Sequence, residues 1–136
     1  MRAVLDSNIL IAALLSRAGP PAQIVSRWLA GEFELVVSDA LLAELTRALA
    51  YPKVQARIPA AAAHAFVALL RQSAVVAADP AEPARRSTDP DDDYLLALAQ
   101  SERAMLVSGD KHLLALADEL PVRTARAFLT ALEEAR

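Results

Sequence analysis

The sequence predicts an α/β domain whose mostly parallel sheet is covered by helices on both faces. Short runs of aliphatic and β-branched residues, such as "FELVVS" and "AMLVS", have the length and composition of buried strands. The longer segments between them place apolar residues at helical spacing. Strands and helices therefore alternate along the chain, and this alternation is typical of parallel strands joined by crossover helices.

Local signals mark the individual elements. Gly31 ends the apolar stripe of the second helix, and Asp39 is expected to cap the third. Asp89 is expected to cap a later helix with Pro90 in its first position. The predicted strands are residues 2–5, 33–38, 74–78, 104–108 and 121–124. The predicted helices are residues 8–16, 22–31, 40–49, 59–73, 90–100, 112–117 and 125–135.

Length and composition indicate one globular domain over residues 1–136, because 55% of the residues are hydrophobic and no linker or repeat divides the chain. Cysteine is absent from the sequence, which excludes disulfides and thiolate metal sites. No apolar run approaches the roughly 20 residues that span a bilayer, so we expect a cytoplasmic protein that does not enter membranes. The net charge of −3 argues against a uniformly basic nucleic-acid-binding surface.

Acidic residues gather where the predicted parallel strands end. Asp6 directly follows the first strand and Asp110 follows the fourth, while Glu44 lies one turn into the helix after the second. A run of aspartates at 89–93 opens the helix after the third strand. Ligands of open α/β sheets bind beyond the carboxyl ends of the strands. Each acid taken alone fits a helix cap, a turn or a solvated surface position, but their convergence on one edge predicts a site.

Helical spacing separates the members of the aspartate run. Asp92 falls on the stripe of Leu95 and Leu96, which is expected to face the sheet, whereas Asp91 and Asp93 are expected to point to the sides. A carboxylate aimed inward near Asp6 and Asp110 requires a cation. Hard cations such as Mg²⁺ or Mn²⁺ prefer carboxylate oxygens, and phosphodiester hydrolysis or phosphoryl transfer is the chemistry they support. The two histidines, His64 and His112, lack metal-ligand spacing.

Four sequence segments together resemble PIN-domain ribonucleases over nearly the whole chain. They are "VLDSNILIAALL", "VVSDALLAEL" with its glutamate, "DPDDDYLLALA" and "LVSGDKHLL". The chain is most similar to PIN proteins of bacterial toxin–antitoxin pairs, which are related to VapC toxins. The resemblance implies a Rossmann-like, three-layer α/β/α PIN domain with about five strands. It also implies Mg²⁺- or Mn²⁺-dependent endoribonuclease activity, homodimerisation and inhibition by a small antitoxin protein.

The resemblance assigns site residues by position. Asp6, Glu44, Asp92 and Asp110 match the family's four catalytic and metal-binding acids, and Asn8 and Ser108 match polar positions that support the metal. Many relatives have Asp-Asn where this chain has Asp92-Asp93, so Asp93 is an alternative third acid, and the stripe favours Asp92. Basic residues that can hold RNA phosphates are Arg47, Lys53, Arg57, Arg85, Arg86 and Lys111.

Two other functions are compatible with these residues. A catalytically silent PIN-fold module that binds RNA or protein retains the fold without turnover. A receiver-like phosphoacceptor domain also combines a doubly wound sheet with a carboxylate cluster and Mg²⁺. However, it requires an acidic pair after the first strand, where this chain has Asp6, Ser7 and Asn8.

Overall fold

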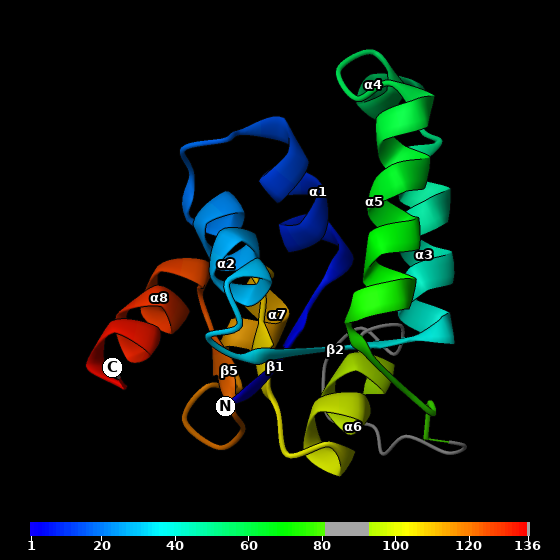
Figure 1. The fold of residues 1–136 in the computed structure, drawn as a ribbon. Helices are drawn as coiled ribbons and strands as arrows, with labels where there is room; N and C mark the ends of the chain where they lie inside the picture. Colours follow the sequence, from blue (N-terminus) through cyan, green and yellow to red (C-terminus); the bar gives the residue numbers. More distant parts are fainter. Residues whose placement is uncertain (81–92, 136) are drawn as a thin grey trace.

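The computed structural model describes residues 1–80 and 93–135 and contains a five-stranded parallel sheet flanked by helices (Figure 1). The strand order is β3-β2-β1-β4-β5, so β1 lies at the centre. The strands are β1 (Arg2–Leu5), β2 (Glu34–Ser38), β3 (Val75–Ala77), β4 (Met105–Val107) and β5 (Val122–Arg123). The helices are α1 (Ser7–Leu15), α2 (Pro20–Leu29), α3 (Asp39–Leu49), α4 (Pro52–Gln55), α5 (Ala60–Ser73), α6 (Asp93–Ser101), α7 (Lys111–Leu114) and α8 (Ala125–Glu134).

The predicted α/β class and the parallel sheet are confirmed, and the described boundaries agree within a few residues. The short helix α4 was not predicted, because four residues are too few to show helical periodicity. The strand order also contradicts the receiver-like alternative. Receiver-type sheets have the order 2-1-3-4-5, whereas β2 lies between β1 and β3 here.

The prediction that Asp39 caps the third helix is wrong. Ser38 is the cap: its backbone is extended and its hydroxyl accepts a hydrogen bond from the Leu41 N–H at 3.3 Å. Asp39 is already the first helical residue, where the helix dipole favours a carboxylate. The predicted cap at Asp89 lies outside the described residues.

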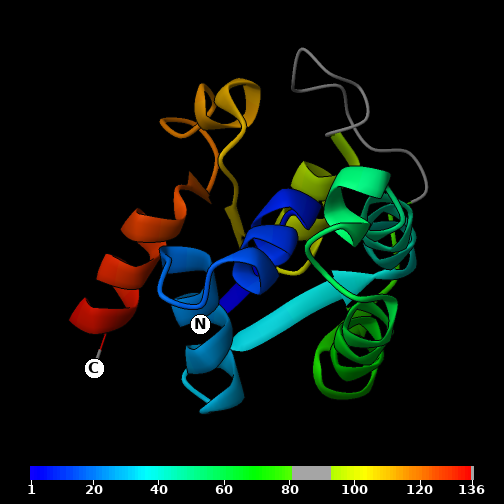
Figure 2. The ribbon, with the colours of Figure 1, turned by 90° about the horizontal axis from the view of Figure 1, so that it is seen from above.

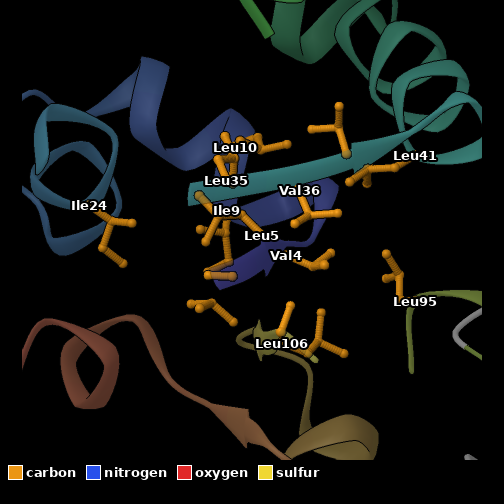
Figure 3. Packing of buried hydrophobic residues seen from close by; sticks show 14 of the residues in the cluster. Val4, Leu5, Ile9, Leu10, Ile24, Leu35, Val36, Leu41, Leu95 and Leu106 are labelled. Atoms are coloured by element: carbon orange, nitrogen blue, oxygen red, sulfur yellow. The ribbon is translucent and has the colours of Figure 1, made fainter. Parts of the chain in front are cut away.

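Helices cover both faces of the sheet (Figures 1 and 2). Helices α1, α2, α3, α5 and α8 contact one another in a continuous layer, and α6 packs on β1 and β4 from the opposite face. Figure 3 shows the core between them, where Val4 and Leu5 of the central strand are fully buried. Leu10 from α1 and Leu95 from α6 approach this strand from opposite sides. The sheet is therefore held rigidly by packing on both faces.

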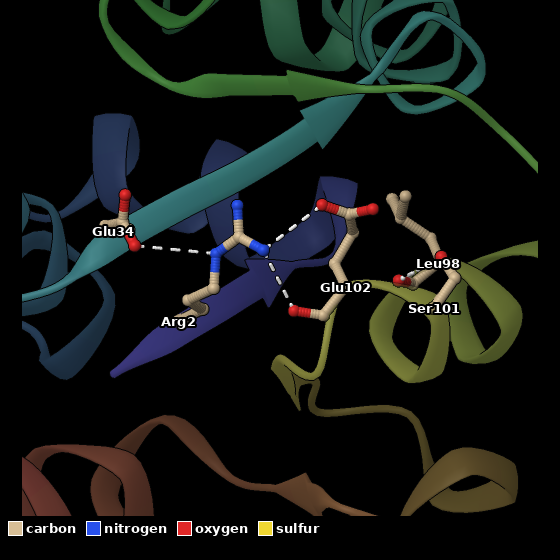
Figure 4. Close-up of polar contacts among 5 residues, drawn as sticks. All are labelled: Arg2, Glu34, Leu98, Ser101 and Glu102. Carbon is tan, nitrogen blue, oxygen red and sulfur yellow. Dashed lines mark hydrogen bonds and ion pairs between the residues drawn. The ribbon is translucent and has the colours of Figure 1, made fainter.

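Polar contacts connect the start of β1 to its surroundings. The guanidinium of Arg2 pairs with Glu34 on β2 at 3.5 Å and with Glu102 after α6 at 3.2 Å (Figure 4). Next to Glu34, Phe33 meets Phe128 of α8 edge to face with ring centroids 5.1 Å apart. These contacts fix the amino end of the sheet and leave its carboxyl edge for the acidic residues.

No single helix in residues 1–80 and 93–135 is long and apolar enough to cross a membrane. Helices α1 and α2 reach the required length and composition only as a pair, with a bend of 96° between them.

Candidate active site

Asp6 is the central carboxylate of the candidate site. It follows β1, the middle strand, and only 6% of its surface is exposed. One carboxylate oxygen accepts a hydrogen bond from the Ile9 N–H at 2.8 Å and so caps α1. The other oxygen accepts a hydrogen bond from the Ser108 hydroxyl. The same side chain therefore serves as a helix cap and belongs to the predicted acidic cluster.

The surroundings of Asp6 shift the pKa of its carboxyl group. Burial is the largest cause and raises the pKa of this carboxyl above its ordinary value, whereas the hydrogen bonds from Ser108 and Ile9 lower it. The negative charges of Glu44 and Asp110 raise it further. The charges of Glu44 and Asp110 therefore act on Asp6 at the carboxyl edge of the sheet, where Asp6 follows β1 and Asp110 follows β4.

Ser108 connects two of these acids. Its side chain is fully buried, and its oxygen donates to Asp6 and accepts the Asp110 N–H at 3.0 Å. The Asp110 carboxylate accepts the His112 N–H at 2.7 Å and caps the short helix α7. Ser108 thus holds the segment after β4 against the segment after β1, which fits the supporting role assigned to it.

Glu44 is half-buried on α3, and a side chain from α6 orients it. The hydroxyl of Tyr94 donates a hydrogen bond to Glu44 Oε2. Burial is the main cause that raises the pKa of Tyr94 far above its ordinary value, followed by this hydrogen bond and by the charges of Glu44, Asp79 and Asp6. Tyr94 was not among the site residues assigned from the sequence.

Asp79 is a further acid that sequence reasoning missed. It follows β3, and its Oδ2 accepts the Ala40 N–H at 3.0 Å near the start of α3. Its Oδ1 is buried and has no hydrogen-bond partner among the described residues. The available signal was its position, since Asp79 follows a strand just as Asp6 and Asp110 do.

The third acid of the predicted cluster falls at the start of α6. Asp92 lies outside the described residues, so its assignment stays a prediction. Asp93 is only 4% exposed, and the expectation that it points sideways is wrong. The cause is the wide buried arc of α6, on which Leu95, Leu96 and Leu98 are all buried. A wide arc covers positions beside the narrow stripe that the spacing had indicated.

The remaining predicted residues are exposed or lie outside the described residues. Asn8 is exposed, although it is adjacent to the cap of α1. Both histidines are exposed as well. The exposed basic candidates are Arg47, Lys53, Arg57 and Lys111, whereas Arg85 and Arg86 lie outside the described residues.

The donor atoms of this edge suit a hard divalent cation. Asp6, Glu44 and Asp110 offer carboxylate oxygens, which Mg²⁺ and Mn²⁺ prefer, and their mutual repulsion is relieved by positive charge. Among residues 1–80 and 93–135, however, no three acidic, histidine or cysteine side chains lie close enough to hold an ion as they stand. The described carboxylates therefore provide the correct chemistry but only part of a ligand set.

Known proteins share the sequence pattern and the fold of this chain. The sequence matches the model of the PIN domain family over residues 2–112. No curated protein matches the chain significantly. Among solved structures, VapBC2 from Rickettsia felis, bound to a DNA fragment from its promoter, is similar with a TM-score of 0.62 and 14% identity, covering 91% of this chain and 98% of that chain. VapBC-1 from nontypeable Haemophilus influenzae gives a TM-score of 0.60 and 20% identity, covering 93% and 99%. A domain of a functionally unknown protein from Methanocaldococcus jannaschii gives a TM-score of 0.56 and 13% identity, covering 90% of this chain and 89% of that chain.

Proposed function

Because this chain belongs to the PIN domain family, we propose that it is a metal-dependent endoribonuclease that hydrolyses RNA phosphodiester bonds. The observation that carries the proposal is the buried carboxylate of Asp6, whose pKa the nearby charges of Glu44 and Asp110 raise. Burying like charges together is costly unless a cation neutralises them. The family's nucleases generally use divalent metals, which agrees with this demand.

We assign the residues of this chain the following roles. Asp6, Asp110 and Asp92 bind Mg²⁺ or Mn²⁺ directly or through water, with Asp93 as the alternative to Asp92, and Glu44 completes the shell or orients the attacking water. The ion supplies a bound water of lowered pKa and stabilises charge on the leaving oxygen. Ser108 keeps Asp6 and Asp110 in place through its two hydrogen bonds.

Exposed basic side chains are proposed to hold the flanking phosphates of the RNA. Arg47 lies on α3, Lys53 on α4, Arg57 two residues after α4, and Lys111 next to Asp110. Arg85 and Arg86 are the further candidates from the sequence. Neutralising phosphates with lysine and arginine makes binding depend on salt. Weaker RNA binding at higher salt is therefore expected for the intact protein.

We further propose that the protein is the toxin of a toxin–antitoxin pair, acts in the cytoplasm as a homodimer and is inhibited by a small antitoxin. Support comes from the similarity to two VapBC structures, because the matches cover 98% and 99% of the chains in those structures. At 14% and 20% identity this likeness concerns the fold, so the partner needs its own test. We expect the tagged chain to copurify with the product of an adjacent short reading frame. We also expect that complex to lack ribonuclease activity.

The function itself is tested with total RNA and the purified protein in the presence of Mn²⁺. We expect cleavage that chelation abolishes and that Asp6→Asn removes while the protein remains folded. Tyr51→Phe is the matched control, because Tyr51 is 62% exposed and lies outside the acidic cluster. Cleavage that survives in highly purified Asp6→Asn protein contradicts the proposal.

One observation favours a second candidate, a catalytically silent module that binds RNA or protein. Both carboxylate oxygens of Asp6 and one of Asp110 already accept hydrogen bonds within the chain. These acids are therefore partly stabilised without a metal ion. RNA binding without cleavage, unchanged by Mn²⁺ and by Asp6→Asn, is the result that this alternative predicts.

A further inference from the structure

Tyr94 joins two elements that carry the acidic site. It is the second residue of α6, and its hydroxyl reaches across to Glu44 Oε2 on α3, a residue 50 positions earlier in the chain. It also directly follows Asp92 and Asp93, the two alternatives for the third acid of the site. Tyr94 is therefore next to the proposed metal-binding acids without being an acid itself.

The bond has a specific effect on Glu44. A glutamate side chain has several rotatable bonds, and fixing it costs conformational entropy when it binds a ligand. A hydroxyl that donates to Oε2 holds the carboxylate in one orientation and leaves Oε1 available. Asp79 steadies the same helix at its start, because its carboxylate accepts the Ala40 N–H. Glu44 is thus held both by its helix and at its tip.

We propose that Tyr94 is a positioning residue that presents Glu44 to the divalent cation, a role that rests on the proposed function. Partners of this kind, which hydrogen-bond to a metal-ligating carboxylate, set metal affinity through orientation. Tyr94 acts through Glu44 and contacts neither the ion nor the RNA.

Mn²⁺ affinity measured by isothermal titration calorimetry, without RNA, tests this role. We expect Tyr94→Phe to weaken binding by about 10- to 100-fold, the usual effect of losing a ligand's hydrogen-bond partner. Tyr51→Phe is the matched control, since it removes the other tyrosine hydroxyl at an exposed position and should leave the affinity unchanged. Unchanged or tighter binding by Tyr94→Phe overturns the inference.

A double-mutant cycle separates positioning from general damage. In the Glu44→Gln background, Tyr94→Phe should have no further effect on Mn²⁺ affinity, because the two residues act as one unit. A full additional loss in that background overturns the role. If wild-type protein binds no Mn²⁺, the proposed function itself fails, and that result is distinct from wild-type binding that Tyr94→Phe leaves intact.

A spectroscopic measurement avoids substituting Tyr94. In Tyr51→Phe protein, Tyr94 is the sole tyrosine. Titration with Mn²⁺ should perturb the tyrosine near-UV absorption with the same dissociation constant that calorimetry gives, because the ion binds the carboxylate to which the phenol donates its hydrogen bond. A calorimetric binding curve without any change in the tyrosine band overturns the inference.

Discussion

Replacing Asp6 by either Asn or Ala separates its two structural roles. Both substitutions remove the buried negative charge, so both variants gain the same stability from losing it. Asparagine keeps a side-chain oxygen that can accept the Ile9 N–H, whereas alanine leaves that N–H without its partner at the start of α1. We therefore expect metal-free Asp6→Asn protein to be more stable than Asp6→Ala.

The expected difference follows from the lost cap. Removing a helix cap costs about 0.5–2 kcal/mol, and a buried unpaired donor costs about 1–3 kcal/mol, so about 1–2 kcal/mol is a reasonable value. An unfolding entropy of about 2.1 cal/mol/K per residue gives roughly 0.29 kcal/mol/K for this chain. The melting temperatures of the two variants should then differ by about 3–7 °C.

Differential scanning calorimetry of both variants in the presence of a chelator measures this difference. The comparison depends on the hydrogen bond from the Ile9 N–H, which asparagine can still accept and alanine cannot. An alanine variant that melts at or above the temperature of the asparagine variant refutes the reasoning, because the cap would then contribute nothing to stability.

Three further outcomes follow. The raised pKa of Asp6 means that its unfavourable contribution is absent below the unfolded value of 3.8, grows as pH rises and is complete above the folded pKa. The stability advantage of metal-free Asp6→Asn over wild type, followed by thermal melts from pH 7 downward, should therefore shrink as the pH falls toward 3.8, and a constant difference contradicts this. Mn²⁺ at 100 times its dissociation constant should raise the melting temperature of the wild type by about 9 °C. The melting temperature of Asp6→Asn should not change, and differential scanning fluorimetry measures both. Urea unfolding should show that Gly31→Ala lowers the free energy of unfolding by about 1 kcal/mol, because Gly31 has a φ of 81°. Gly109→Ala is the control: an added Cβ meets no neighbouring atom at either glycine, so this variant should be close to neutral. Equal losses of stability in the two variants exclude backbone conformation as the cause.

The sequence contained enough information for the sheet and for the gathering of acids at one edge. Strand patterns predicted parallel pairing, and parallel pairing places the ends of all strands at the same edge, which is why Asp6 and Asp110 could be expected together. Side-chain contacts between distant elements were beyond such reasoning. The bond from Tyr94 to Glu44 depends on how α6 packs relative to α3, and no local pattern encodes that packing.

Two smaller differences have local causes. Ser38 and Asp39 are both good caps, and which of them is the last extended residue depends on where β2 ends in the sheet rather than on propensity. Asp79 follows the short strand β3 outside any predicted element, so its hydrogen bond to α3 was not anticipated. In both cases tertiary geometry decided between residues that the sequence treated as equivalent.

The central position of β1 has a consequence for the order of events during synthesis. The hydrogen bond between Asp6 and Ser108 joins residues 102 positions apart, and β1 finds its second neighbour only when β4 has been made. At typical translation rates those residues take roughly 5–20 seconds to emerge. Closing so long a loop also slows folding. A nascent chain therefore lacks an assembled acidic edge until nearly all of it has been synthesised, and partial chains that stop before β4 are expected to be inert.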